Sequence, residues 1–246
     1  MRKILVLGLA GILVLMAIGI AMALTAGPTT IYGSYHDLSS SGKALTATNV
    51  NQICVFCHTP HSGLALSGDY AYLWNRWAST TTYQTYTSST MNATEPSTMS
   101  GVSAICLSCH DGSVAIGVLN NVYGQNFTAT FTQTANSNAS YNTGTPGWKM
   151  SSGLPFLGTD LRNDHPVGFT YDSALAAADG GLQTPGTNSV TGTTNGTGIT
   201  LTLFNQKLEC ATCHNVHRPG ATTTGDFPFL AASNNNSSLC LTCHLK

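Results

Sequence analysis

The chain has 246 residues, and only 8% of them are charged; 9 Lys and Arg against 10 Asp and Glu give a formal net charge of −1. A protein that binds nucleic acid through its phosphates needs a basic surface, so this composition excludes that class of function. Hydrophobic residues make up 42% of the chain, which is enough for a folded core.

The N-terminus has the order of features found in exported proteins. Two basic residues precede an apolar run over residues 4–24, and small residues stand at Ala23 and Ala26. This order predicts a signal peptide over residues 1–26, cleaved after Ala23 or Ala26. The run is also long enough to span a bilayer, so an uncleaved anchor is the alternative. We therefore expect an exported protein, extracellular or at the cell surface, with the periplasm as the alternative.

A motif of the form Cys-x-x-Cys-His occurs four times and contains all eight cysteines. Two cysteines one helical turn apart can form thioether bonds to the two vinyl groups of a haem, while the next histidine binds the iron. Four copies predict four c-type haems. The predicted attachment sites are Cys54, Cys57, Cys106, Cys109, Cys210, Cys213, Cys240 and Cys243, and the predicted proximal iron ligands are His58, His110, His214 and His244.

Two other uses of paired cysteines fit the sequence less well. A zinc ribbon gives no reason for a histidine after every cysteine pair. Disulfides are common in exported proteins, but a Cys-x-x-Cys disulfide is strained and redox-active, and four of them in one chain would be unusual. Covalent haem therefore remains the prediction.

The number of remaining histidines matches the number of distal ligands that four haems need. The chain has eight histidines, so four are left after the proximal ligands are assigned. We predict bis-histidine ligation, with Met91, Met99 and Met150 as packing residues rather than ligands. The acidic neighbours Asp37, Asp111 and Asp164 could orient imidazoles or form ordinary turns. The predicted distal ligands are His36, His61, His165 and His217.

His61 and His217 each stand three residues after a proximal histidine. A distal ligand must approach the iron from the opposite face of the haem, which a residue one turn away on the same side cannot reach. Each of the two should therefore bind the iron of a different haem and tie two haems together.

Irons with imidazole on both faces have no free position for a substrate. This favours outer-sphere electron transfer over catalysis, so we predict an electron-transfer protein and not an enzyme. A multihaem reductase with one labile axial ligand is the least favoured alternative, because no distal histidine is missing.

Few long periodic segments are visible between the motifs. We expect short helices at the motifs and over residues 174–178, and a strand over residues 198–204. The polar stretches 126–145 and 184–197 are expected to be surface excursions or disordered linkers. The predicted fold class is mostly irregular coil with short helices and little strand, a multihaem cytochrome c fold in which residues 27–246 wrap as one domain around four haems.

The order of these motifs resembles one known family over nearly the whole mature chain. That family is the tetrahaem extracellular cytochrome nanowires of the outer-membrane cytochrome E type. The matching segments are Ser34-Tyr35-His36-Asp37, Cys54 to His61, Leu73-Trp74-Asn75, Cys106 to Gly112, Asp164 to Gly168 and Cys213 to His217.

The resemblance implies a helical filament in which one histidine of each subunit completes a haem in its neighbour. The crossing ligand should be His61, which must leave its own haem, with His36 as second candidate. Other partners would be redox proteins or extracellular electron acceptors, without nucleic acid and without a membrane span after cleavage. A monomeric periplasmic tetrahaem shuttle is the alternative function.

Overall fold

The computed structural model describes residues 31–64, 73–135, 137–144, 147–194, 197–217 and 229–245. The predicted signal peptide lies outside these ranges. Within them, every helix is too short or too polar to cross a membrane.

Short elements follow one another along the described chain, with strands more frequent than helices. The helices are η1 (Cys54–Phe56), α2 (Gly101–His110), α3 (Ser173–Asp179), α4 (Cys210–Cys213), η2 (Asn235–Ser237) and η3 (Cys240–Thr242). The strands are β1 (Leu45–Ala47), β2 (Val118–Val122), β3 (Gln125–Thr128), β4 (Phe131–Gln133), β5 (Ala139–Asn142), β6 (Lys149–Gly153), β7 (Phe169–Thr170), β8 (Ser189–Thr194), β9 (Thr197–Thr202) and β10 (Lys207–Leu208).

All the strands pair antiparallel in five sheets of two strands: β1 with β4, β2 with β3, β5 with β6, β7 with β10 and β8 with β9. The expected fold class, mostly coil with little strand in a multihaem cytochrome c fold, is therefore wrong, since paired strands are the main regular structure. The helices expected at the motifs and over residues 174–178 are confirmed by η1, α2, α4, η3 and α3, and the strand expected over residues 198–204 by β9.

The polar stretches expected to be excursions or linkers instead contribute strands to the two-stranded sheets. Residues 126–145 include most of β3 and all of β4 and β5, and β8 begins at Ser189. In the β8–β9 hairpin, Val190 and Leu201 pair and are buried, while the hydroxyls of Thr191 and Thr200 share a hydrogen bond of 2.8 Å on the other face. Alternation of small apolar and β-branched polar residues therefore makes a strand from a stretch whose average composition is that of a loop.

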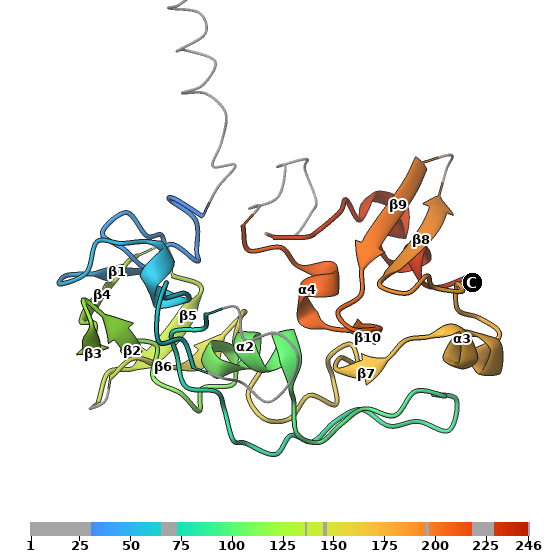
Figure 1. Ribbon diagram of the computed structural model, residues 1–246, viewed down its shortest axis with the longest axis horizontal. Coiled ribbons are helices and arrows are strands. Elements are labelled where there is room, and N and C mark those ends of the chain that lie inside the picture. Colours follow the sequence, from blue (N-terminus) through green and yellow to red (C-terminus); the bar gives the residue numbers. More distant parts are fainter. Residues whose placement is uncertain are drawn as a thin grey trace, which may run out of the picture.

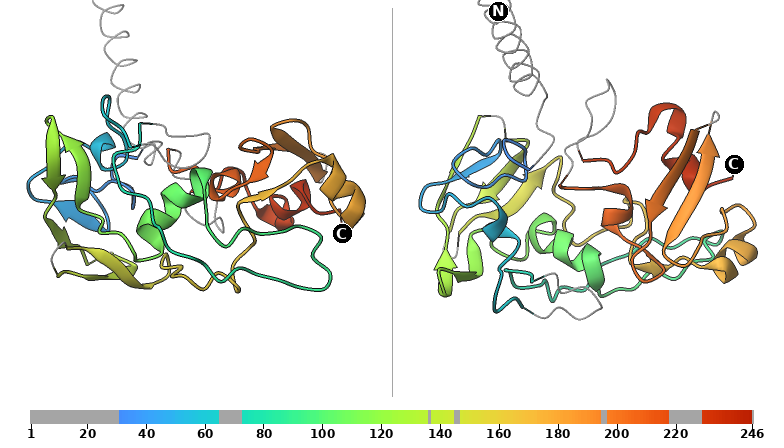
Figure 2. Two further views of the ribbon diagram at one scale, coloured as in Figure 1. Left: turned by 60° about the horizontal axis from the view of Figure 1, so that its bottom comes forward. Right: turned by 45° about the horizontal axis from the view of Figure 1, so that its top comes forward.

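Two main apolar clusters lie toward the two ends of an elongated molecule (Figure 1). One is built on β1, η1, β2 and β4 and includes Leu45, Phe56 and Leu119. The other is built on β7 to β10 and η3 and includes Tyr171, Val190 and Leu203. Helix α2 lies between the two ends in all three views (Figures 1 and 2). The motifs are thus distributed along the molecule: η1 at one end, α2 and α4 centrally, and η3 at the other.

Candidate haem-binding sites

Each Cys-x-x-Cys-His motif forms a single tight turn. In three of them the backbone N–H of the histidine donates to the carbonyl of the first cysteine: His58 to Cys54 at 2.8 Å, and His214 to Cys210 and His244 to Cys240 at 3.0 Å. The other motif forms the end of α2, which finishes at His110. This turn brings the two cysteines and the histidine to one side of the backbone, as attachment to one macrocycle requires.

None of the eight cysteines forms a disulfide, and thiols of consecutive motifs are neighbours. Burial and then the Cys109 thiol raise the pKa of Cys57 to about 12. A hydrogen bond between Cys106 and Cys210 raises the pKa of the first and lowers that of the second.

The fourth motif continues the same order. Burial, followed by the thiol of Cys213, raises the pKa of Cys243 to about 12. The first motif therefore lies next to the second, the second next to the third, and the third next to the fourth.

The imidazoles of His36 and His110 face each other with ring centres 6.0 Å apart. Nδ1 of His110 lies 2.7 Å from the carbonyl oxygen of Pro155. Because a carbonyl only accepts, Nδ1 carries the proton and Nε2 has a free lone pair. Burial, and then the nearby His110, lowers the pKa of His36 to about 3, so this ring is neutral, as a metal ligand must be.

The imidazoles of His58 and His217 form a second pair, with ring centres 6.2 Å apart and an interplanar angle of 17°. The Trp74 ring packs edge-on at 6.1 Å from that of His58. The backbone N–H of His217 donates to Oδ1 of Asn215 at 3.1 Å. Residues more than 150 positions apart in the sequence thus meet at one site.

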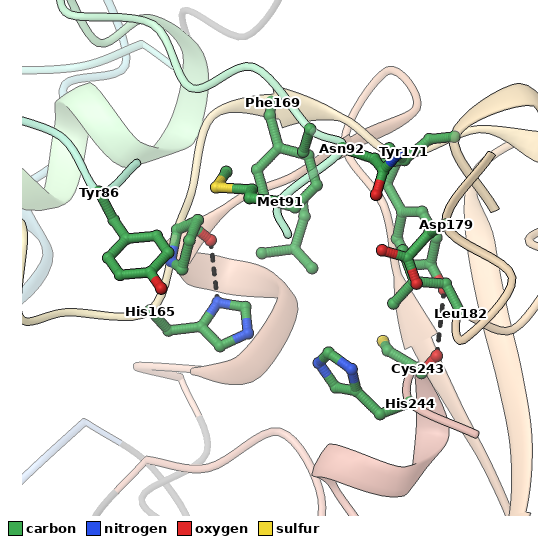
Figure 3. A pocket seen from close by; sticks show the side chains of 14 residues that line it. Tyr86, Met91, Asn92, His165, Phe169, Tyr171, Asp179, Leu182, Cys243 and His244 are labelled. Carbon is green, nitrogen blue, oxygen red and sulfur yellow. Dashed lines mark hydrogen bonds between the residues drawn. The ribbon is translucent and has the colours of Figure 1, made fainter. Parts of the chain in front are cut away.

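His165 and His244 form the third pair, at 6.3 Å between ring centres (Figure 3). Nδ1 of His165 donates to the carbonyl oxygen of Pro166 at 2.9 Å, which again leaves Nε2 free. The pair lines a cavity of about 200 Å³ that is partly open to solvent, together with apolar side chains such as those of Phe169 and Leu182.

Strand β8 packs against η3, which carries the cysteines beside this pair. A Cβ atom added to Gly192 of β8 would lie 2.5 Å from Cα of Thr242, so only glycine allows this approach. The hairpin thereby covers the attachment turn of the fourth motif.

All three separations fit an iron held between two imidazoles. Two metal–nitrogen bonds of roughly 2.0 Å, with roughly 1.1 Å more from each nitrogen to its ring centre, put the centres about 6.2 Å apart. Each pair joins one proximal histidine to one distal histidine, with adjoining cysteines to hold a macrocycle. The residues therefore fit bis-imidazole haem at three sites.

His61 and His214 remain. Neither ring has another described imidazole opposite it, unlike the rings of the three pairs. Both residues are exposed. The carbonyl of His61 accepts hydrogen bonds from the Thr59 hydroxyl at 2.7 Å and from the Asn121 amide at 2.8 Å, which fix its backbone at the surface. One predicted distal and one predicted proximal ligand thus stay without a partner in the described chain.

The methionines and acidic residues have structural contacts. Met99 and Met150 are buried, and Met91 lines the cavity of His165 and His244. Asp37 accepts hydrogen bonds from Ser39 and Ser41, and Asp111 from Tyr83 and Ser113. Neither carboxylate bonds a histidine, so the turn role applies to both.

The groups that orient His110 and His165 are the carbonyls of Pro155 and Pro166. Sequence reasoning missed them because every residue has a carbonyl and no residue type marks this role.

The described residues contain no group of three or more His, Cys, Asp or Glu placed to hold a metal ion. No protein-family model and no curated protein sequence matches the chain.

Proposed function

We propose that the chain is a tetrahaem c-type cytochrome that conducts electrons along closely packed haems as the subunit of an extracellular filament. The observation that carries the proposal is the set of three proximal–distal imidazole pairs at 6.0, 6.2 and 6.3 Å. Such spacing at three separate places is expected for residues that hold irons and has no role in an apolar core.

The chain's own residues bind, orient and separate the redox groups. The cysteine pairs would hold four macrocycles covalently, and the adjoining thiols of consecutive motifs would keep those macrocycles close. The carbonyls of Pro155 and Pro166 fix the tautomers of His110 and His165, which leaves Nε2 of each ring free to bind an iron. Bound haem supplies one-electron chemistry between Fe(III) and Fe(II).

Imidazoles on both faces would exclude substrates from the iron. At the three paired sites a third ligand can enter only by displacing a histidine, which favours conduction over a reductase activity. The predicted signal peptide would export the chain from the cytoplasm. Covalent attachment of c-type haem and contact with extracellular acceptors both take place outside the cytoplasm.

The two unpaired imidazoles support assembly into a filament. One chain carries an open distal ligand, His61, and an open proximal ligand, His214. A ligand donated from one subunit to a different surface of the next makes a head-to-tail interface, which generates an open filament when the rotation does not close a ring. His36, the second candidate for crossing, already faces His110, so His61 is the better choice.

A haem count and electron microscopy of the secreted protein test the proposal. We expect four covalent haems per chain by pyridine haemochrome assay, and filaments by cryo-electron microscopy. Secreted protein without covalent haem would overturn the function. A monodisperse monomer with four bis-imidazole signals in electron paramagnetic resonance would overturn the filament and favour the periplasmic shuttle.

A further inference from the structure

An imidazole that binds a metal is usually oriented by a hydrogen bond from its second ring nitrogen to a carbonyl or a carboxylate. His110 follows this rule, because its Nδ1 donates to the carbonyl of Pro155 at 2.7 Å. His165 follows it as well, with the carbonyl of Pro166 at 2.9 Å. The imidazole that faces His110 is held in a different way.

The ring of His36 lacks such a hydrogen bond. Its Nδ1 atom is buried and has no hydrogen-bond partner among the described residues. Buried polar atoms without a partner are uncommon in folded proteins, so this one requires a physical reason. The backbone N–H of His36 donates to the hydroxyl of Ser34 at 3.2 Å, which holds the backbone but leaves the rotation of the side chain undetermined.

The side chain of Phe229 packs directly against this imidazole. The two ring centres are 4.4 Å apart, and the ring planes cross at 88°. An edge-to-face pair has a preferred geometry, because the positive edge of one ring meets the negative face of the other. Phe229 is only 7% exposed, so neighbouring atoms keep its own ring in place. Packing therefore restricts the rotation of the His36 ring where no hydrogen bond does.

Another paired histidine shows that this contact is unusually close. The ring of Trp74 packs edge-on against that of His58, but the two centres are 6.1 Å apart. At 4.4 Å the Phe229 and His36 rings touch, so the imidazole cannot turn without displacing its neighbour.

The backbone of Phe229 has a conformation that bulky residues rarely adopt. Its φ is +70°, in the left-handed region. Hydrogen bonds to the third motif surround it: the N–H of Asn215 donates to the carbonyl of Phe229 at 2.6 Å, and the N–H of Ala231 donates to the carbonyl of Cys213 at 2.8 Å. Strain of this kind persists only where the surrounding structure imposes it, and it is frequent at functional sites.

We infer that Phe229 is a positioning residue, which sets the plane of the His36 imidazole and thereby the angle between the two axial ligands of the haem at the second motif. That angle is 48° between the rings of His36 and His110. The inference rests on the proposed function. Because the backbone of Phe229 is bonded to the third motif, an axial ligand of one haem takes its orientation from the attachment turn of the next.

Electron paramagnetic resonance of the oxidised, assembled protein tests this role. The g values of a low-spin ferric haem depend on the angle between the planes of its two imidazoles. Phe229→Leu keeps a buried apolar side chain but removes the flat ring, and it should shift the g values of one low-spin signal while the others stay unchanged. Phe229→Tyr retains the ring and should retain every signal. If Phe229→Leu shifts no signal, the inference is wrong.

Phe131→Leu is the matched control. Phe131 is also 7% exposed, and its ring packs against those of Phe56 and Trp148 rather than against an imidazole. The same substitution there should leave all the signals unchanged. An equal shift from Phe131→Leu would mean that any loss of aromatic packing disturbs the ligands, which would overturn the specific role of Phe229.

A glycine variant separates the ring from the backbone strain. Glycine adopts a φ of +70° without steric cost, so Phe229→Gly keeps the observed backbone conformation and removes the side chain. It should shift the same signal as Phe229→Leu. If the signal stays unchanged in Phe229→Gly, the backbone and not the ring orients His36, and the inference is wrong.

A ligand variant assigns the shifted signal. His36→Met replaces one imidazole of this haem by a thioether, so the signal that it removes should be the one that Phe229→Leu shifts. Two different signals would overturn the inference while the proposed function stands, provided that the protein carries four covalent haems. Absence of covalent haem would instead overturn the proposed function.

Discussion

Residues 54–61 and 210–217 have the same pattern, Cys-x-x-Cys-His-x-x-His, yet the structure uses their second histidines differently. His217 lies opposite His58, so the second segment completes the site of the first. His61 finds no facing imidazole in the described chain, and neither does His214. The second segment therefore supplies a facing imidazole to the first, but the first supplies none to the second.

The difference shows what a local pattern can and cannot decide. If haems are bound at the motifs, spacing alone requires both second histidines to bind the iron of a different motif. Which partner each one meets depends on how the segments are packed. The first segment lies against the Trp74–Arg76 stretch, whereas α4 of the second is anchored on α2 through Glu209. This asymmetry leaves His61 and His214 without a facing imidazole among the described residues.

Alanine variants of the two second histidines, His61 and His217, should show the largest difference between the two segments. On the proposed function, His61→Ala should leave four attached haems and an unchanged spectrum of the isolated subunit but abolish filaments, because His61 would bind a haem of the neighbouring subunit. His217→Ala should give the isolated subunit a new high-spin haem, since His58 loses its facing imidazole. Electron paramagnetic resonance and negative-stain microscopy measure the two outcomes. Normal filaments from His61→Ala would show that another ligand crosses.

Among the side chains that hold the first segment in place, that of Asn75 should contribute most to the free energy of unfolding. Its Nδ2 donates to the carbonyls of Val55 at 2.6 Å and Asn121 at 2.9 Å, and its Oδ1 accepts from the N–H of Asn121 at 2.7 Å. Asn75→Ala leaves these buried groups unpaired and should cost about 3 kcal/mol of unfolding free energy. Denaturant unfolding checks the value. Asn92→Ala, at an exposed position, is the control and should change stability by less than about 0.5 kcal/mol.

Glu209 has the corresponding role for the second segment. Glu209→Ala removes the cap of α4 and leaves the N–H and hydroxyl of Ser103 without their acceptor, so the unfolding free energy should fall by about 2 kcal/mol. Glu209→Gln keeps an acceptor and should lose less than half of that. The same denaturant titration compares the two variants, and equal losses would mean that the charge rather than the hydrogen bonds stabilises the junction.

The smallest effect is expected from the hydroxyl that holds His61 at the surface. Thr59→Val keeps the side-chain shape but removes the 2.7 Å hydrogen bond to the carbonyl of His61, which should weaken assembly about fivefold through about 1 kcal/mol of lost organisation. The critical concentration for filament formation measures it. Thr191→Val, on the exposed face of the β8–β9 hairpin, should leave that concentration unchanged.

The four motifs and their tight turns could be recognised in the sequence, whereas the fold class around them could not. A motif such as Cys106 to His110 encodes its chemistry in residue type and spacing, which do not depend on the rest of the chain. Strand β9 was expected, but its partner β8 was missed because a Thr- and Gly-rich composition is equally compatible with a loop. Its strand character depends on Val190 and Leu201 being buried together, and on Gly192 reaching η3.

The local chemistry follows from the sequence alone: eight thiols and four adjacent imidazoles in single turns, and four further imidazoles. If haems are bound at the motifs, the spacing also requires His61 and His217 to serve other sites. Those properties follow from covalent spacing within a few residues. The packing of the folded chain places His217 opposite His58 and His36 opposite His110. These neighbours are far apart in the sequence, so only the packing of hairpins and helices brings them together.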